Sequence, residues 1–76
     1  MARINNEKYT KAFSKHLRET RIKCGMTLDQ LGTLSKLDLA TVHRIEMSNG
    51  NVTLSTMIAL AQGLNVHPKE LLSFYK

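Results

Sequence analysis

Residues 27–46, TLDQLGTLSKLDLATVHRIE, decide the fold of this chain. They read as two short helices that meet at a tight turn. Thr27 and Gln30 fit a capping box, in which the threonine hydroxyl accepts the amide three residues on and the glutamine side chain reaches back. Asp38 is a good N-cap for a second helix that begins at Leu39, because its carboxylate lies at the positive end of the helix dipole. The stretch therefore predicts a helix-turn-helix.

The second of these helices has an inner and an outer side. Val42 and Ile45 are three residues apart and are expected to face the core. The outer faces carry five candidate base-reading residues, which are Leu39, Ala40, Thr41, His43 and Arg44. In the major groove arginine pairs with guanine, and apolar groups meet the thymine methyl. Leu39 fits either such a methyl contact or a protein interface.

The chain from residue 13 to residue 72 resembles the Cro/C1-type (XRE-type) helix-turn-helix family almost position by position. Three motifs carry the resemblance: Arg-x-x-x-Gly (Arg21, Gly25), Thr-x-x-x-Leu (Thr27, Leu31) and Thr-hydrophobic-x-Arg-hydrophobic-Glu (Thr41, Val42, Arg44, Ile45, Glu46). The resemblance implies an all-α, five-helix, lambda-repressor-like DNA-binding domain with a central helix-turn-helix.

Residues of the basic first helix, of the start of the second helix and of the loop after the third helix are expected to contact the DNA backbone. These expected phosphate contacts are Lys15, Thr27, Leu28, Ser48, Asn49, Asn51 and Thr53. Leu28 stands where the family often has Gln, so a contact there falls to backbone amides and the helix dipole. Lys36 stands at the turn, where the family favours Gly or Asn, and it can adopt a positive φ only at some cost in strain.

Arg21 and Glu46 occupy positions that this family commonly joins by a buried or half-buried ion pair. If they pair, Arg21 is not available to DNA. The alternative is that both side chains are solvated.

The 76-residue chain has a net charge of +5 that is unevenly distributed. Residues 1–24 hold seven Lys and Arg against two Glu, whereas residues 25–76 hold four basic and four acidic residues. A basic first helix is either a solvated face or, beside a helix-turn-helix, a flank that meets phosphates. A chain of this length predicts a single domain, residues 1–76, with a core over 7–74 and a basic tail over 1–6.

The remaining helices are predicted from apolar spacing and stop signals. A first helix over residues 7–24 has an inward stripe of Tyr9, Phe13 and Leu17 and stops at Gly25. The two helices of the central stretch are expected over about 28–35 and 39–47.

A fourth helix is predicted over residues 54–62, with Thr53 as its cap and Gly63 at its end. Its expected core face comprises Leu54, Met57, Ile58 and Ala61. A fifth helix follows, with His67 as N-cap and Pro68 in its first turn.

No motif in the chain indicates catalysis, a cofactor or a metal site. The three histidines, His16, His43 and His67, have no acidic or thiol partners at metal-ligand spacing and read as surface or capping residues. Cys24 reads as a half-buried thiol and excludes an internal disulfide framework. Met26 and Met57 read as core filler.

No apolar run is long enough to cross a bilayer, and the N-terminus lacks the apolar stretch of a secretory signal, so a cytoplasmic protein is expected without a membrane partner.

The sequence thus predicts a transcriptional regulator, a repressor, that binds double-stranded DNA. It would read a palindromic operator as a homodimer, with its third helix in the major groove. The expected dimer interface comprises Leu71, Leu72, Phe74 and Tyr75. The competing hypothesis is a protein-interaction module, such as the antitoxin of a toxin-antitoxin pair, whose protein partner the sequence does not identify.

Overall fold

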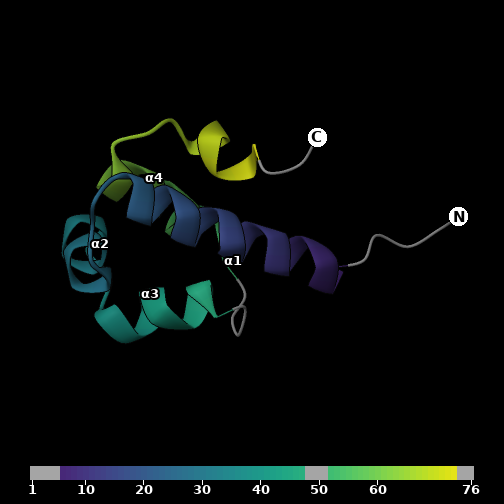
Figure 1. The fold of residues 1–76 in the computed structure, drawn as a ribbon, viewed down its shortest axis with the longest axis horizontal. Coiled ribbons are helices and arrows are strands. Elements are labelled where there is room, and N and C mark those ends of the chain that lie inside the picture. The colour runs from purple at the N-terminus through teal and green to yellow at the C-terminus, as the bar shows by residue number, and fades with distance from the viewer. Residues whose placement is uncertain (1–5, 48–51, 74–76) are drawn as a thin grey trace, which may run out of the picture.

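The structure, a computed structural model, describes residues 6–47 and 52–73. In these ranges the chain forms four α-helices and one short 3-10 helix, shown in Figure 1. They are α1 (Asn6–Lys23), α2 (Leu28–Ser35), α3 (Leu39–Glu46), α4 (Leu54–Leu64) and η1 (Pro68–Leu72). The described residues contain no strand, and the all-α prediction is confirmed.

The expected fifth helix is a five-residue 3-10 helix and not an α-helix. His67 is its N-cap and Pro68 lies in its first turn, as predicted. The Ser73 N–H donates to the carbonyl of Glu70, so the element closes with i to i+3 hydrogen bonds before a full α-helical ladder forms. His16 ties η1 to α1, because its Nε2 lies 2.6 Å from the Glu70 carbonyl oxygen.

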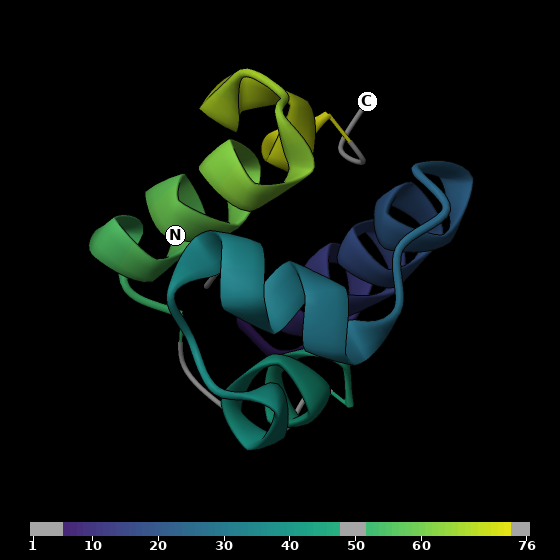
Figure 2. The ribbon, with the colours of Figure 1, turned by 90° about the vertical axis from the view of Figure 1, so that its left-hand side faces the viewer.

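The helices surround one core, with α1 running along the length of the molecule (Figure 1). In Figure 1, α3 lies on one side of α1 and η1 on the other, and α2 lies at the end of the molecule where α1 stops. Figure 2 looks onto α2, which packs against both α3 and α4. The helix-turn-helix is therefore held between α1 and α4.

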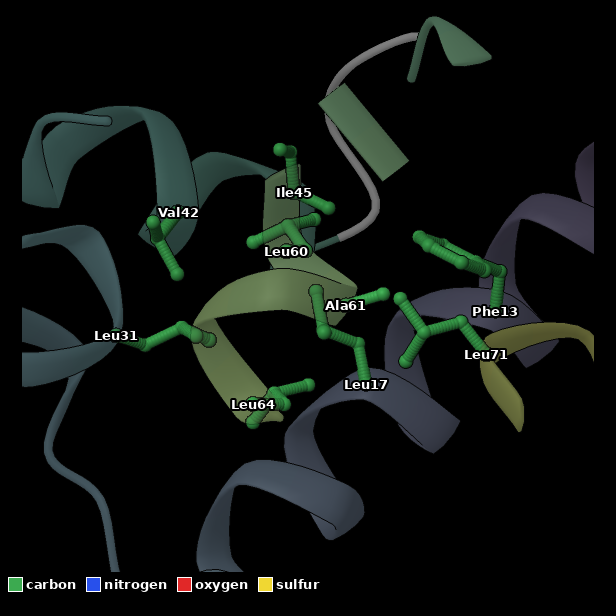
Figure 3. Close-up of a cluster of buried hydrophobic side chains, with 9 residues drawn as sticks. All are labelled: Phe13, Leu17, Leu31, Val42, Ile45, Leu60, Ala61, Leu64 and Leu71. Atoms are coloured by element: carbon green, nitrogen blue, oxygen red, sulfur yellow. The ribbon is translucent and has the colours of Figure 1, made fainter. Parts of the chain in front are cut away.

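Each helix contributes to the core, which Figure 3 shows in close-up. Its buried members are Phe13, Leu17, Leu31, Val42, Ile45, Leu60, Ala61, Leu64 and Leu71. The predicted inward positions of the first and third helices are thereby confirmed for Phe13, Leu17, Val42 and Ile45. Met26 and Met57 pack against this core and are partly buried, as expected.

The core face of α4 differs from the prediction. Leu54 and Ile58 are 67% and 37% exposed, whereas Leu60 and Leu64 are buried together with Ala61. Apolar residues occur almost all around this helix, so its periodicity does not define a single inward side. The packing of α2 and η1 against α4 decides which side is covered.

The end of α4 also differs from the prediction. The helix continues through Gly63 to Leu64, and Asn65 ends it in the left-handed conformation with φ of 58°. Gly63 has a packing role instead. A Cβ atom at this position would collide with Ser35 Oγ and lie 3.1 Å from Leu31 Cδ1. Glycine therefore allows α2 and α4 to approach closely.

Cys24 is exposed, so the expectation of a half-buried thiol is wrong. Position 24 is seven residues after Leu17 and would face inward if the helix continued. However, α1 ends at Lys23, and Gly25 turns the chain away with φ of 71°.

Candidate nucleic-acid interface

The capping box at the start of α2 is present as predicted. Thr27 Oγ1 accepts the Gln30 N–H at 3.1 Å, and Gln30 Oε1 accepts the Thr27 N–H at 2.8 Å. These bonds satisfy two backbone donors at the helix N-terminus and fix where the helix begins.

The turn between α2 and α3 is built around Lys36 in the left-handed conformation. Its φ and ψ are 58° and 37°, and its N–H donates to the carbonyl of Thr33 at 3.2 Å. Leu37 N–H donates to the Gly32 carbonyl at 2.8 Å. A Cβ atom on Gly32 would lie 2.9 Å from the Leu37 carbonyl oxygen, so glycine is required for this tight return of the chain.

Asp38 caps α3 as predicted. Its Oδ1 accepts the Thr41 N–H at 2.8 Å. Hydrogen bonds from the Thr41 side chain, and then from the Thr41 backbone, lower the pKa of Asp38 below its ordinary value of 3.8. The cap is therefore ionised at neutral pH and lies at the positive end of the helix dipole.

Most of the candidate base-reading residues lie on the surface of α3. Leu39 is 47% exposed, and Ala40, His43 and Arg44 are also exposed. Thr41 is half-buried beside the Asp38 cap. Because Val42 and Ile45 are buried, α3 presents one continuous outer face of apolar, imidazole and guanidinium groups.

Met47 extends this face and has no role in the sequence interpretation. It is the C-cap of α3 and is 57% exposed. It follows Ala40 by seven residues and Arg44 by three, and residues at these spacings share a helix face. Its position as the last residue of the predicted reading helix was the available signal.

Four of the seven expected phosphate contacts lie in the described part of the chain. Lys15, Thr27 and Thr53 are exposed, and Leu28 is half-buried against the core. The hydroxyls of Thr27 and Thr53 already accept backbone N–H groups as N-caps. Ser48, Asn49 and Asn51 lie outside the described residues.

Arg21 and Glu46 are brought together in a bidentate ion pair. Arg21 Nε donates to Glu46 Oε2 at 2.7 Å, and Nη2 donates to Oε1 at 3.1 Å. Arg21 Nη1 also donates to the carbonyl of Met26 at 2.7 Å. The two side chains are only 11% and 4% exposed, so this guanidinium is unavailable to a ligand.

The other described cations of α1 are exposed. Lys8, Lys11, Lys15 and Arg18 follow one another at three- or four-residue steps and therefore share a helix face. Lys11 Nζ lies 3.0 Å from Glu7 Oε1 in a surface pair. The interpretation of this face as a phosphate-binding flank stays a prediction.

Two of the residues expected at a dimer interface, Leu71 and Leu72, lie in the described part of the chain. Leu71 is fully buried in the core, which corrects its assignment to an exposed interface. Leu72 is 50% exposed, and Phe74 and Tyr75 lie outside the described residues. Leu54 and Ile58, four residues apart on α4, are exposed as well, and α4 contacts η1.

Over residues 6–47 and 52–73, no group of three or more His, Cys, Asp or Glu side chains is arranged to hold a metal ion. None of the helices in these ranges combines the length and the apolar character that a membrane span requires.

Comparisons with known proteins identify this architecture. The family model HTH_3, helix-turn-helix, matches residues 17–71. The restriction-modification controller protein C.AhdI from Aeromonas hydrophila is 35% identical over 82% of this chain and 94% of that chain, with a TM-score of 0.80. No curated protein matches the chain.

Two further solved structures are similar. The wild-type restriction-modification controller protein C.Esp1396I is 25% identical over 86% of each chain, with a TM-score of 0.80. The clp gene regulator ClgR from C. glutamicum is 20% identical over 87% of this chain and 86% of that chain, with a TM-score of 0.81, and shows the fold alone.

Proposed function

Because this chain belongs to the Cro/C1-type helix-turn-helix family, we propose that it is a DNA-binding transcriptional regulator that represses its target genes. The outer face of α3 carries this proposal. The helix α3 is capped at its start by Asp38, and the Arg21–Glu46 pair holds its end. Its outer face exposes Arg44 beside His43 and Ala40. The likeness to restriction-modification controller proteins supports a regulatory role.

Arg44 is the proposed principal base contact. It is exposed in the middle of the outer face, and a guanidinium pairs with two acceptors of guanine in the major groove. Leu39 and Ala40 are proposed to meet thymine methyl groups beside it. The backbone amides at the start of α2 would hold a phosphate, because the side chain of Leu28 packs inward.

We further propose that the protein reads a palindromic operator as a homodimer. One helix in the major groove reads about four or five base pairs, which gives too little specificity alone, whereas a two-fold dimer reads two half-sites about one helical turn apart. Of the predicted interface residues that the structure describes, Leu72 is exposed on the surface. Leu54 and Ile58 of α4 are also exposed and would add apolar area to the interface.

Selection of bound sites from random duplex DNA tests this proposal. The wild-type protein should enrich an inverted repeat. Arg44→Ala should lose its preference at one base pair in each half-site, by about 1–3 kcal/mol for a bidentate contact. A matched variant, Lys15→Ala, should weaken all duplexes alike, because a phosphate contact carries no sequence information.

Two outcomes would contradict the proposal. If wild-type protein enriches no sequence, the protein-interaction module, such as an antitoxin, becomes the better interpretation of the exposed apolar residues. If Arg44→Ala weakens all sequences equally, Arg44 is a phosphate contact and the base-reading assignment is wrong.

A further inference from the structure

We infer that Ser14, on α1, is a positioning residue for DNA recognition, which sets the orientation of α3 without touching DNA. The inference rests on the proposed function. Ser14 is 2% exposed, and its Oγ donates to the carbonyl oxygen of Ile45 at 2.5 Å. The two residues are 31 positions apart in the sequence. Neither residue belongs to the outer face of α3.

The hydrogen bond lies where α3 needs an external partner. The last four carbonyls of an α-helix have no partner within the helix, and Ile45 is the second-last residue of α3. A buried carbonyl that loses its donor is costly, so the serine hydroxyl stabilises the packed position of this helix end.

Ser14 and Arg21 together hold one end of α3. They are seven residues apart, and therefore lie two turns apart on the same face of α1. They bind the neighbouring residues Ile45 and Glu46. Figure 1 shows α3 alongside α1, while the start of α3 continues from α2 through the turn. The start of α3 is thus fixed by the turn and its end by these two contacts.

The ion pair acts on the end of α3 only through the Glu46 side chain, and not on the helix backbone. Arg21 has a long side chain and pairs with the Glu46 carboxylate, which lies at the end of another long side chain. Ser14 has a short side chain and donates a hydrogen bond directly to the α3 backbone. Loss of the serine hydroxyl should therefore allow α3 to shift about the ion pair, so that Arg44 and its neighbours meet base edges less accurately.

Ser35 provides a matched control for this idea. It is the other buried serine among the described residues, at 5% exposed, and its hydroxyl has no hydrogen-bond partner in the part of the chain that the structure describes. Both Ser14→Ala and Ser35→Ala remove one buried hydroxyl from a helix. Only the first removes a contact to α3.

The test compares affinity for the duplex enriched by wild-type protein with affinity for a scrambled duplex. In Ser14→Ala the ratio of the two affinities should fall about fivefold, the factor that corresponds to one typical hydrogen bond, while affinity for the scrambled duplex stays the same. Ser35→Ala should keep the wild-type ratio. Equal ratios in the two variants, or a parallel loss on both duplexes, would overturn the inference.

A second measurement needs no DNA and separates this inference from the proposed function. Amide hydrogen exchange near the end of α3, at residues 45–47, should be faster in Ser14→Ala than in wild-type protein, with α4 unchanged. Ser35→Ala should not show this pattern. If wild-type protein enriches no duplex, the proposed function fails and exchange still decides whether Ser14 positions α3.

Should Ser14→Ala fail to fold, Ser14→Cys takes its place in both measurements, in the presence of a reductant. Cysteine is similar in size to serine but is a weaker donor, so an intermediate ratio and intermediate exchange are expected. Wild-type values in both measurements for Ser14→Cys would then overturn the inference.

Discussion

Arg21 stabilises the fold through three hydrogen bonds and not through its surface charge. Two of the bonds reach Glu46 and one reaches the Met26 carbonyl. Arg21→Ala should lower the free energy of unfolding by about 3 kcal/mol, because the Glu46 carboxylate would remain nearly buried without its partner. Urea denaturation followed by circular dichroism measures this change.

Lys11→Ala is the control for Arg21→Ala at the residue scale. Both changes remove one positive charge from α1, but Lys11 pairs with Glu7 in solvent, with side chains 66% and 76% exposed. Exposed pairs of this kind contribute little, so the urea midpoint should hardly move. Equal midpoints for Lys11→Ala and Arg21→Ala would show that the Arg21–Glu46 pair is not a structural link.

Two of the described helices, α2 and α4, end at a residue other than glycine in the left-handed conformation, at Lys36 and Asn65. Lys36→Gly should raise the free energy of unfolding by about 0.5–1 kcal/mol, because the lysine Cβ is strained at positive φ. Asn65→Gly should raise the free energy of unfolding by less, since asparagine tolerates the left-handed conformation better than lysine does. Thermal unfolding of the two variants provides the comparison, and a larger gain from Asn65→Gly would contradict the explanation.

Features that depend on neighbouring residues were predictable from the sequence. The caps of α2, α3 and α4 involve residues three positions apart, so Thr27, Asp38 and Thr53 could be assigned without knowledge of the packing. The boundaries of α1 to α3 agree closely with the predicted ranges for this reason. The positive φ of Lys36 agrees with the family's preference for Gly or Asn at this turn.

The Arg21–Glu46 pair joins residues 25 positions apart and was expected only through the family resemblance. Other features that depend on distant packing were not predictable. The apolar sequence of α4 fits several inward faces, and only the positions of α2 and η1 leave Leu54 exposed. Ser14 is polar, so the apolar periodicity of α1 does not reveal that it is buried. Its hydrogen-bond partner is 31 residues away in the sequence. The apolar side of the last helix is expected to supply the dimer interface, but Leu71 on that side is buried in the core of the same chain.

At the scale of the whole molecule, Leu72 and Leu34 offer a direct test of the dimer. Both are large, apolar and about half exposed, at 50% and 56%, but Leu34 lies on α2. Leu72→Glu should convert a concentration-dependent dimer into a monomer in sedimentation, because the carboxylate would be desolvated in the interface. Leu34→Glu should leave the dimer intact.

Loss of the dimer should also lower operator affinity, since a single half-site gives little specificity. A wild-type protein that stays monomeric at high concentration and on DNA would contradict the dimer while leaving the fold unaffected. Dissociation by Leu34→Glu instead would place the interface on α2.

The contact between η1 and α1 has a consequence for synthesis of the protein. Leu71 is buried in the same core as Phe13 and Leu17, and His16 bonds to the carbonyl of Glu70, 54 residues later. The N-terminus of a chain leaves the ribosome first, so the apolar stripe of α1 emerges before η1, which helps to cover it. A nascent chain in which η1 is still inside the ribosome cannot bury this stripe completely, so the native core can close only after Leu71 has emerged.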